Sequence, residues 1–214
     1  MRKLVVGTFL TVDGVMQAPG GPDEDRERAF AHGGWSVNYW DDVMGRIITD
    51  WTLQAGALVL GRKTYEIFAA HWPGVSGDDP VAATLNSVPK YVASRTLDEV
   101  TWNNSTLVKG DVAEAIAALK EEAGAEIQVH GSGDLAQTLI EHDLVDEYRL
   151  WVFPIVLGQG KRLFARGAVP AALKLVDTTI SSTGVAIHTY ERADAIEYGS
   201  FEVDVQGQTS KLWT

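Results

Sequence analysis

Short apolar runs alternate with segments of helical periodicity along most of this chain, and that alternation restricts the possible folds more than any other feature. Runs rich in β-branched and apolar residues that end in turn signals predict strands, and apolar residues at helical spacing predict helices. Strands are predicted over Leu4–Val12, Ala57–Leu60, Lys90–Ala93, Thr106–Val108, Glu126–His130 and Glu147–Leu157. Helices are predicted over 41–54, 62–68, 111–122 and about 131–142, with a helical turn near 81–85. Strands separated by helices pair in parallel, so the order predicts an α/β fold of three layers (αβα) around a mostly parallel sheet.

The last third of the chain follows a different pattern. Leu173–Val176 and Val185–Glu191 read as an antiparallel pair at the C-terminal edge of the sheet. No linker rich in Pro, Gly or Ser divides the chain, so residues 1–192 are expected to form a single domain. Residues 193–214 are then a C-terminal extension, in which Tyr198–Val203 is expected to add an edge strand.

Composition excludes several classes of function. The chain has 18 Lys and Arg against 29 Asp and Glu, a formal net charge of −11, which argues against a nucleic-acid partner. Cysteine is absent and the five histidines are scattered, so no disulfide, thiolate nucleophile or metal site is expected. No apolar run is long enough to span a bilayer. These observations favour a cytoplasmic protein that acts without a membrane.

Three predicted strands end in segments that suit a phosphate group. A glycine after a strand lets backbone approach a ligand closely, and the start of the following helix offers unpaired N–H groups. The candidate phosphate-binding residues are Gly61, Arg62, Lys63 and Thr64; Ser94, Arg95 and Thr96; and Gly131, Ser132, Gly133, Asp134 and Leu135. Each segment alone is more often a tight turn or a surface ion pair. Together, at strand ends of one sheet, they indicate a ligand with separated phosphates, such as a dinucleotide with an extra ribose phosphate.

The last segment also matches the pattern G-x-G-x-x-A, but an ordinary Rossmann site is disfavoured. No acidic residue ends the following strand, where the partner of the ribose belongs. The carboxylate of Asp134 would repel a pyrophosphate beside it. This residue is expected at the helix start, where it faces away from the phosphates and complements the helix dipole.

Candidate residues for the substrate lie mainly before the first helix. Trp35, Tyr39 and Trp40 offer aromatic faces for a flat heterocycle, and Asp41 or Asp42 offers a carboxylate for its edge. Core packing and stabilisation of the helix start are the competing explanation. His130, at a strand end, faces either the substrate or a hydrogen-bond partner in the sheet. The charged run at 23–28 is expected to be a solvated loop or helix start.

Five segments carry a resemblance to a known family. They are Thr11-Val12-Asp13-Gly14, residues 60–66 (LGRKTYE), residues 92–96 (VASRT), residues 131–147 from GSGDL to LVDE, and residues 154–160 (PIVLGQG). In these the chain resembles the dihydrofolate reductase-like superfamily. It is most similar to the C-terminal reductase domain of bifunctional riboflavin-biosynthesis deaminase-reductases. The resemblance covers residues 2–192.

This resemblance implies an NADPH-dependent reductase that transfers a hydride to a C=N or C=O group of a small heterocyclic, pterin- or pyrimidine-like substrate, or to a carbonyl compound. The segments at 61–64 and 94–96 would hold the adenosine phosphates, and 131–135 the pyrophosphate. Candidates for substrate contact are Asp13, Trp35, Tyr39 and Trp40, and candidates for catalysis are Asp41, Asp42 and His130. A homodimer is also implied.

Departures from the family make the cofactor half of the resemblance stronger than the substrate half. An acidic residue usually precedes the glycine run, where this chain has His130, and Ser132 stands where many relatives have glycine. A basic residue and a Trp-Ile-Thr motif usually follow the Asp-Gly turn, where this chain has Val15 and no such motif. Three alternatives therefore stay open: a non-catalytic NADP(H)-binding module, a true 5-amino-6-ribosylaminouracil phosphate reductase, and a mainly structural dimer.

Overall fold

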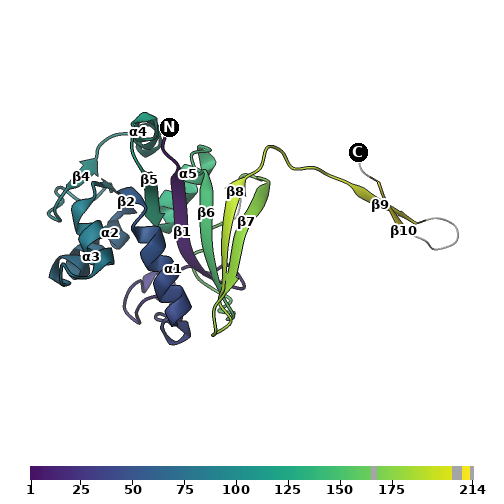
Figure 1. Cartoon of the computed structure of the whole chain (residues 1–214), viewed down its shortest axis with the longest axis horizontal. Coiled ribbons are helices and arrows are strands. Elements are labelled where there is room, and N and C mark those ends of the chain that lie inside the picture. The colour runs from purple at the N-terminus through teal and green to yellow at the C-terminus, as the bar shows by residue number, and fades with distance from the viewer. Residues whose placement is uncertain (165–167, 204–208, 213–214) are drawn as a thin grey trace.

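The computed structural model describes all residues except 165–167, 204–208 and 213–214. An eight-stranded sheet forms its centre, with the order β4-β3-β2-β5-β1-β6-β8-β7 (Figure 1). The strands are β1 (Leu4–Thr11), β2 (Ala55–Gly61), β3 (Lys90–Ala93), β4 (Ser105–Val108), β5 (Glu126–His130), β6 (Glu147–Phe153), β7 (Leu173–Ile180) and β8 (Ala186–Arg192). All pairs from β4 to β6 are parallel, whereas β8 runs antiparallel to β6 and to β7. The predicted mostly parallel sheet with antiparallel strands at its C-terminal edge is confirmed.

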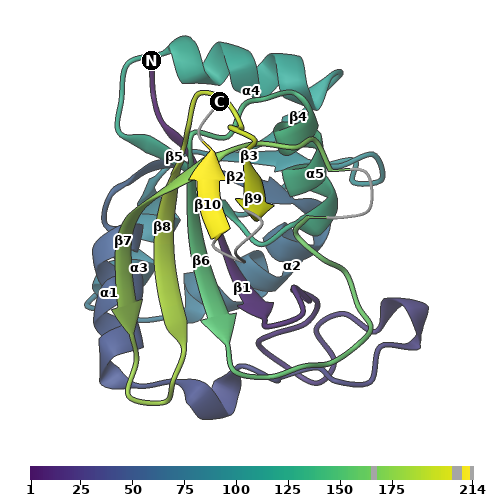
Figure 2. The same ribbon diagram turned by 90° about the vertical axis from the view of Figure 1, so that its right-hand side faces the viewer.

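Helices cover both faces of this sheet. They are α1 (Asp42–Thr52), α2 (Arg62–His71), α3 (Pro80–Ser87), α4 (Val112–Glu121) and α5 (Gly133–Glu141), with 3-10 turns at Glu27–Ala29, Val37–Tyr39 and Trp72–Gly74. Side chains of α4 and α5 form one apolar cluster with the sheet, and those of α1, α2 and α3 form two others. Figure 2 shows α1 and α5 on opposite sides of the sheet. The three layers are therefore as predicted. None of the described helices has the length and apolar character needed to cross a membrane.

Aspartates begin three of the helices. Asp41, Asp79 and Asp111 each accept a hydrogen bond from the backbone N–H three residues ahead, at 2.9–3.0 Å. Such caps satisfy N–H groups that have no partner inside the helix and contribute about 1 kcal/mol each. Asp111 begins α4 in this way, and Asp41 begins α1.

Strand β6 lies at the centre of the core. Six of its seven residues are buried, as its nearly continuous apolar sequence predicts. Tyr148 and Leu150 pack toward α4 and α5, while Trp151 and Phe153 pack on the α1 side. The strand ends at Phe153, four residues before its predicted end, because Pro154 has no N–H to donate to a sheet ladder.

The C-terminal residues do not extend the main sheet. Strand β9 (Ser200–Val203) pairs antiparallel with β10 (Thr209–Leu212) in a separate two-stranded sheet. Figure 1 shows this hairpin away from the sheet, at the end of an extended segment. The prediction that Tyr198–Val203 adds an edge strand is therefore wrong. Its hydrogen-bonding groups pair with β10, and β7 occupies the edge that it was expected to join.

Asp13 fastens the turn after β1 to the segment after β6. Its carboxylate accepts hydrogen bonds from the Thr11 hydroxyl at 2.6 Å and from the backbone N–H groups of Leu157 and Gly158 at 3.2 and 2.8 Å. Arg162 forms an ion pair with the same group at 3.3 Å. The substrate contact predicted for Asp13 is thus replaced by a structural role, because its carboxylate is fully engaged by the protein.

We expect Asp13→Asn to lower the free energy of unfolding by about 2 kcal/mol at neutral pH. The hydrogen bond from Thr11, together with those from Gly158 and Leu157, lowers the pKa of Asp13 from 3.8 to about 2. A depressed pKa contributes stability above pH 3.8, and this contribution is lost as the pH falls through about 2. Urea unfolding measured between pH 7 and pH 2 should show this acid-sensitive part of the free energy of unfolding in the parent protein. It should also show it in Asp98→Asn, a control variant at an exposed aspartate. If the stability of Asp13→Asn depended on acid in the same way as that of the parent protein, the structural role of Asp13 would be refuted.

Candidate functional site

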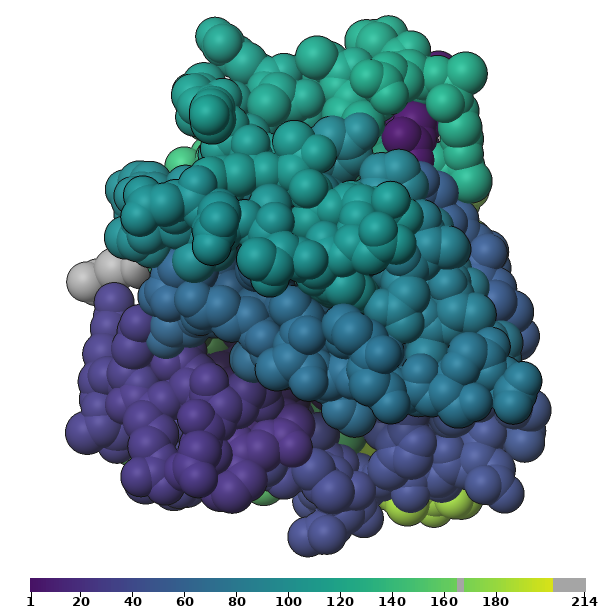
Figure 3. All heavy atoms as spheres, turned by 90° about the vertical axis from the view of Figure 1, so that its left-hand side faces the viewer, coloured from purple at the N-terminus to yellow at the C-terminus, as the bar shows by residue number. Residues whose placement is uncertain are grey.

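One large cavity opens at the carboxyl ends of the parallel strands. Its volume is about 1420 Å³, and its walls come from β1, β2, β3, β5, α1, α2 and the loop after β1. Figure 3 shows its mouth as a hollow between the purple N-terminal segment and the blue-to-teal segment that follows β2. Pockets for one drug-sized molecule hold about 300–1,000 Å³, so this cavity has room for two reactants side by side.

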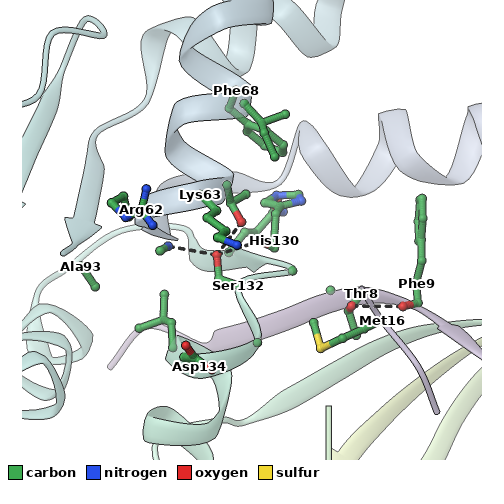
Figure 4. Close-up of a pocket in the computed structure, with 18 of the residues that line it drawn as sticks. Thr8, Phe9, Met16, Arg62, Lys63, Phe68, Ala93, His130, Ser132 and Asp134 are labelled. Atoms are coloured by element: carbon green, nitrogen blue, oxygen red, sulfur yellow. Dashed lines mark hydrogen bonds between the residues drawn. The ribbon is translucent and has the colours of Figure 1, made fainter. Parts of the chain in front are cut away.

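The first and third predicted phosphate segments contact each other inside this cavity. The Ser132 hydroxyl accepts a hydrogen bond from the Gly61 N–H at 2.9 Å and donates one to the Thr64 hydroxyl at 2.7 Å (Figure 4). A Cβ on Gly61 would lie only 3.1–3.2 Å from the Ser132 side chain, so glycine permits this approach. The ends of β2 and β5 are thereby held together in front of two helix starts.

The turn at Gly131 and Ser132 leads into α5 with an unusual backbone. Both residues have positive φ values, 56° and 57°. A left-handed residue next to a right-handed helical one, as at Ser132 and Gly133, turns successive N–H groups toward one side and forms an anion-binding concavity. Asp134 lies in the first turn of α5, as expected, but it borders the cavity, so the expectation that it faces away from the site is wrong. The turn and the helix start therefore suit a phosphate, as the sequence predicts.

The second predicted segment completes one side of the cavity. Ser94 accepts hydrogen bonds from the N–H groups of Thr96 and Leu97 at 3.1 and 3.0 Å, which shapes the turn after β3. Arg95 is exposed at the cavity and makes no ion pair with any described residue. Arg62 differs, because it pairs with Glu66 at 3.0 Å along α2. All twelve residues predicted to hold phosphates line this one cavity.

Lys63 is engaged by the loop after β1. Its ammonium lies 2.7 Å from Asp25 and 2.6 Å from Glu27, and Lys161 lies 2.7 Å from each of the same carboxylates. Burial raises the pKa of Asp25, but the hydrogen bonds from Lys161 and Lys63 outweigh it and lower the pKa to about 2. The prediction of a solvated loop is wrong at Asp25, because the side chain of this residue is only 11% exposed. These four charges fasten the loop at one side of the cavity.

Polar side chains form the floor of the cavity next to the phosphate segments. His130 on β5 and Arg149 on β6 lie on either side of Gly7 in the register of the sheet. A Cβ on Gly7 would meet only the Val129 carbonyl oxygen, at 4.0 Å, so this glycine leaves the floor open. Arg149 forms a bidentate ion pair with Glu126, with both distances at 2.8 Å.

Burial, and then the positive charge of Arg149, lower the pKa of His130 to about 4. The imidazole is therefore neutral at pH 7. Its Nε2 lies 3.0 Å from the Gln128 side-chain oxygen, and its ring lies 5.9 Å from that of Phe68. His130 thus faces the cavity and has a hydrogen-bond partner in the sheet, which confirms the second expectation, while its contact with a substrate stays a prediction.

Aromatic rings form the wall beyond this floor. Trp40 stacks on Trp151 at 6.1 Å with an interplanar angle of 11°, and Phe9 and Trp51 lie at 5.4 and 5.3 Å from Trp151. All four line the cavity. Only Trp40 was identified from sequence. Phe9 and Trp151 lie on two buried strands, along which side chains alternate between the two faces of the sheet. This alternation identifies them as cavity residues only once the register of β1 and β6 is known.

The other aromatic and acidic candidates lie outside the cavity lining. Trp35 and Tyr39 pack against Phe153 at 5.2 and 5.8 Å, so their role is core packing. Asp41 caps α1 and accepts hydrogen bonds from the backbone N–H and hydroxyl of Ser182, both at 2.7 Å. Asp42 is exposed in the first turn of α1. The structure does not support a catalytic role for either carboxylate, because the cavity contacts α1 from its second turn onward. No group of His, Asp and Glu suited to a metal ion occurs among the described residues.

The RibD C-terminal domain family matches residues 2–188 of this sequence. The chain belongs to the RibD C-terminal domain family. A relative in this size range, the uncharacterized protein YyaP of Bacillus subtilis, is 30% identical over 194 residues, which cover 88% of this chain and 94% of YyaP. The family and the fold are reductase-like, which supports an oxidoreductase in general.

Solved structures show the same fold. A putative riboflavin biosynthesis protein from Shewanella is 22% identical with a TM-score of 0.63, over 90% of this chain and 99% of that one. Dihydrofolate reductase from Enterococcus faecalis, solved in complex with NADP(H), is 15% identical with a TM-score of 0.56, over 90% of this chain and 97% of that one. The dihydrofolate reductase-like architecture expected from the sequence is therefore confirmed.

Proposed function

We propose that this protein is an NADPH-dependent reductase that transfers a hydride to a small heterocyclic or carbonyl acceptor. The observation that carries the proposal is the convergence of three strand-end segments on one cavity whose other half has aromatic walls. The dihydrofolate reductase of similar fold was solved with NADP(H), which supports the choice of coenzyme.

The residues present fit such a coenzyme. The left-handed Ser132 before the helical Gly133 creates a concave backbone, and the missing Cβ of Gly61 keeps space beside it. Arg95, which forms no ion pair with a residue that the structure describes, places its guanidinium at the same cavity, where it is suited to bind a monoester phosphate. In this assignment 131–135 hold the pyrophosphate, while Arg95, with 61–64, holds the adenosine phosphates.

NADPH, when bound, supplies the hydride, and the acceptor gains one hydride and one proton. The chain's own contribution is to hold the two reactants together and to exclude water, which accounts for most of the acceleration in such reactions. Phe9, Trp40 and Trp151 offer flat apolar surfaces for an acceptor, and Gly7 keeps the floor beneath it open. The loop fastened by Lys63 and Lys161 forms one wall of the cavity.

The test is oxidation of NADPH by the purified protein with a panel of pterins, pyrimidines, flavins and quinones. We expect turnover with at least one acceptor, and we expect Gly7→Val to reduce it by about tenfold or more because the added side chain fills the floor. Gly77→Val, which adds the same side chain where nothing lies within 4 Å, is the control. Binding of NADPH without oxidation by any acceptor would favour the non-catalytic binding module instead.

A further inference from the structure

The orientation of the Gln128 side chain is fixed by its neighbours. Its Nε2 donates hydrogen bonds to the Trp51 carbonyl oxygen at 2.5 Å and to the Glu126 carboxylate at 2.6 Å. Both partners are oxygens that only accept, so the amide nitrogen must lie on this side. The amide oxygen of Gln128 consequently faces His130.

This orientation also fixes the tautomer of His130. The Gln128 oxygen lies 3.0 Å from Nε2, and a carbonyl oxygen only accepts hydrogen bonds, so Nε2 carries the proton. Because the imidazole is neutral at pH 7, Nδ1 keeps a free lone pair. His130 is therefore a hydrogen-bond acceptor on the side away from Gln128.

The free nitrogen is open to the cavity. In the described part of the chain, Ser105 Oγ is the one side-chain N or O atom that is buried without a partner. Nδ1 of His130 has no hydrogen-bond partner among the described residues, so it cannot be buried, and the residue lines the cavity. Figure 4 shows the ring between Phe68 on α2 and the turn that carries Ser132.

We propose that His130 selects the substrate by accepting a hydrogen bond from an N–H group of a planar heterocycle through Nδ1. This inference rests on the proposed function, because it places the heterocycle as the hydride acceptor against the aromatic wall. On the same floor, Arg149 only donates hydrogen bonds and is engaged by Glu126 and Glu147, so it offers no acceptor, whereas Nδ1 of His130 can accept one from a ring N–H or amino group. A hydride-accepting heterocycle with a methyl group in place of that hydrogen would leave Nδ1 without a hydrogen-bond partner. A polar site that is left unpaired in this way binds the methylated compound much more weakly.

Lumazine and 1,3-dimethyllumazine form a matched pair of probes, because both are flat pteridines and only the first has ring N–H groups. We would titrate each into the protein by calorimetry, with and without saturating NADP⁺. Lumazine should bind about tenfold more tightly to the parent protein, the size expected for one lost hydrogen bond in a buried site. His130→Leu should reduce this ratio to near one, and His130→Asn, which keeps an acceptor near the position of Nδ1, should retain part of it. His142→Leu, at an exposed histidine outside the cavity, is the control.

Nitrogen NMR of the parent protein gives a second readout that requires no variant to fold. It should show His130 as the neutral tautomer with the proton on Nε2. A proton on Nδ1, an unchanged ratio in His130→Leu, or equal or absent binding of both probes to the parent would overturn the inference. A loss of NADP⁺ affinity in His130→Leu with an unchanged ratio would also overturn it, because the histidine would then serve the coenzyme. Oxidation of NADPH with hydride acceptors other than these two probes tests the proposed function separately.

Discussion

Replacing Arg149 with methionine is expected to lower the free energy of unfolding by about 3–5 kcal/mol. The guanidinium lies between two buried carboxylates, 2.8 Å from Glu126 and 2.7 Å from Glu147. The side chains of all three residues are at most 11% exposed. Without Arg149, Glu126 would remain buried with no cation among the described residues, because Lys3 pairs with Glu147, at 3.1 Å, and with Glu191. An uncompensated buried charge is far more costly than the loss of a surface ion pair.

Urea unfolding of the purified variants measures this difference. Arg26→Met is the matched control, because its ion pair with Asp23 joins two side chains that are 70% and 73% exposed. The control should change the free energy of unfolding by less than about 1 kcal/mol. Equal losses in the two variants would show that the buried ion pairs of Arg149 do not stabilise the sheet.

Replacing Arg95 with alanine is expected to weaken NADPH binding by about 10–100-fold and to leave NADH binding nearly unchanged. Arg95 borders the cavity after β3 and has no ion pair among the described residues. Its charge is therefore available to the phosphate that distinguishes NADPH from NADH. Arg62 is a weaker candidate for this contact, because its guanidinium already pairs with Glu66 at 3.0 Å.

Calorimetric titration of each coenzyme into the parent and variant proteins tests this prediction. Arg46→Ala removes the same charge from an exposed position on α1 outside the cavity, so it controls for the change in net charge. Equal weakening of NADPH and NADH by Arg95→Ala would show that Arg95 does not contact the extra phosphate.

The sequence sufficed to locate the phosphate segments because they depend on local signals. A glycine or serine directly after an apolar run marks a strand end, and the carboxyl ends of parallel strands meet at one edge of a sheet. Gly61, Ser94 and Gly131 were found in this way, and all three line the cavity. The hydrogen bond between Ser132 and Gly61 was not foreseeable, since it joins residues 71 positions apart.

The substrate half of the cavity depends on register, which the sequence does not specify. Phe9, Trp151 and Arg149 come together only because β1 lies beside β6 in one register, and a shift by one residue would place each on the opposite face. Asp41 was misassigned for a related reason. An aspartate before a helix is consistent with both a cap and a ligand contact, and only the position of the cavity along α1 decides between them.

The loop after β1 shows a further limit of local reasoning. The charged run at 23–28 is typical of a solvated segment, and Asp23 is indeed exposed. Asp25 is instead held by Lys63 and Lys161, which are 38 and 136 residues away in sequence. Ion pairs between such distant segments leave no periodic signal in the sequence.

Calorimetric titration of the unmodified protein with NADPH tests the assignment of the cavity as an NADPH site. We expect saturable binding of one NADPH per chain, tighter than binding of NADH, with competition by NADP⁺. The absence of any binding, or equal affinity for the two reduced coenzymes, would contradict the assignment of the cavity as an NADPH site.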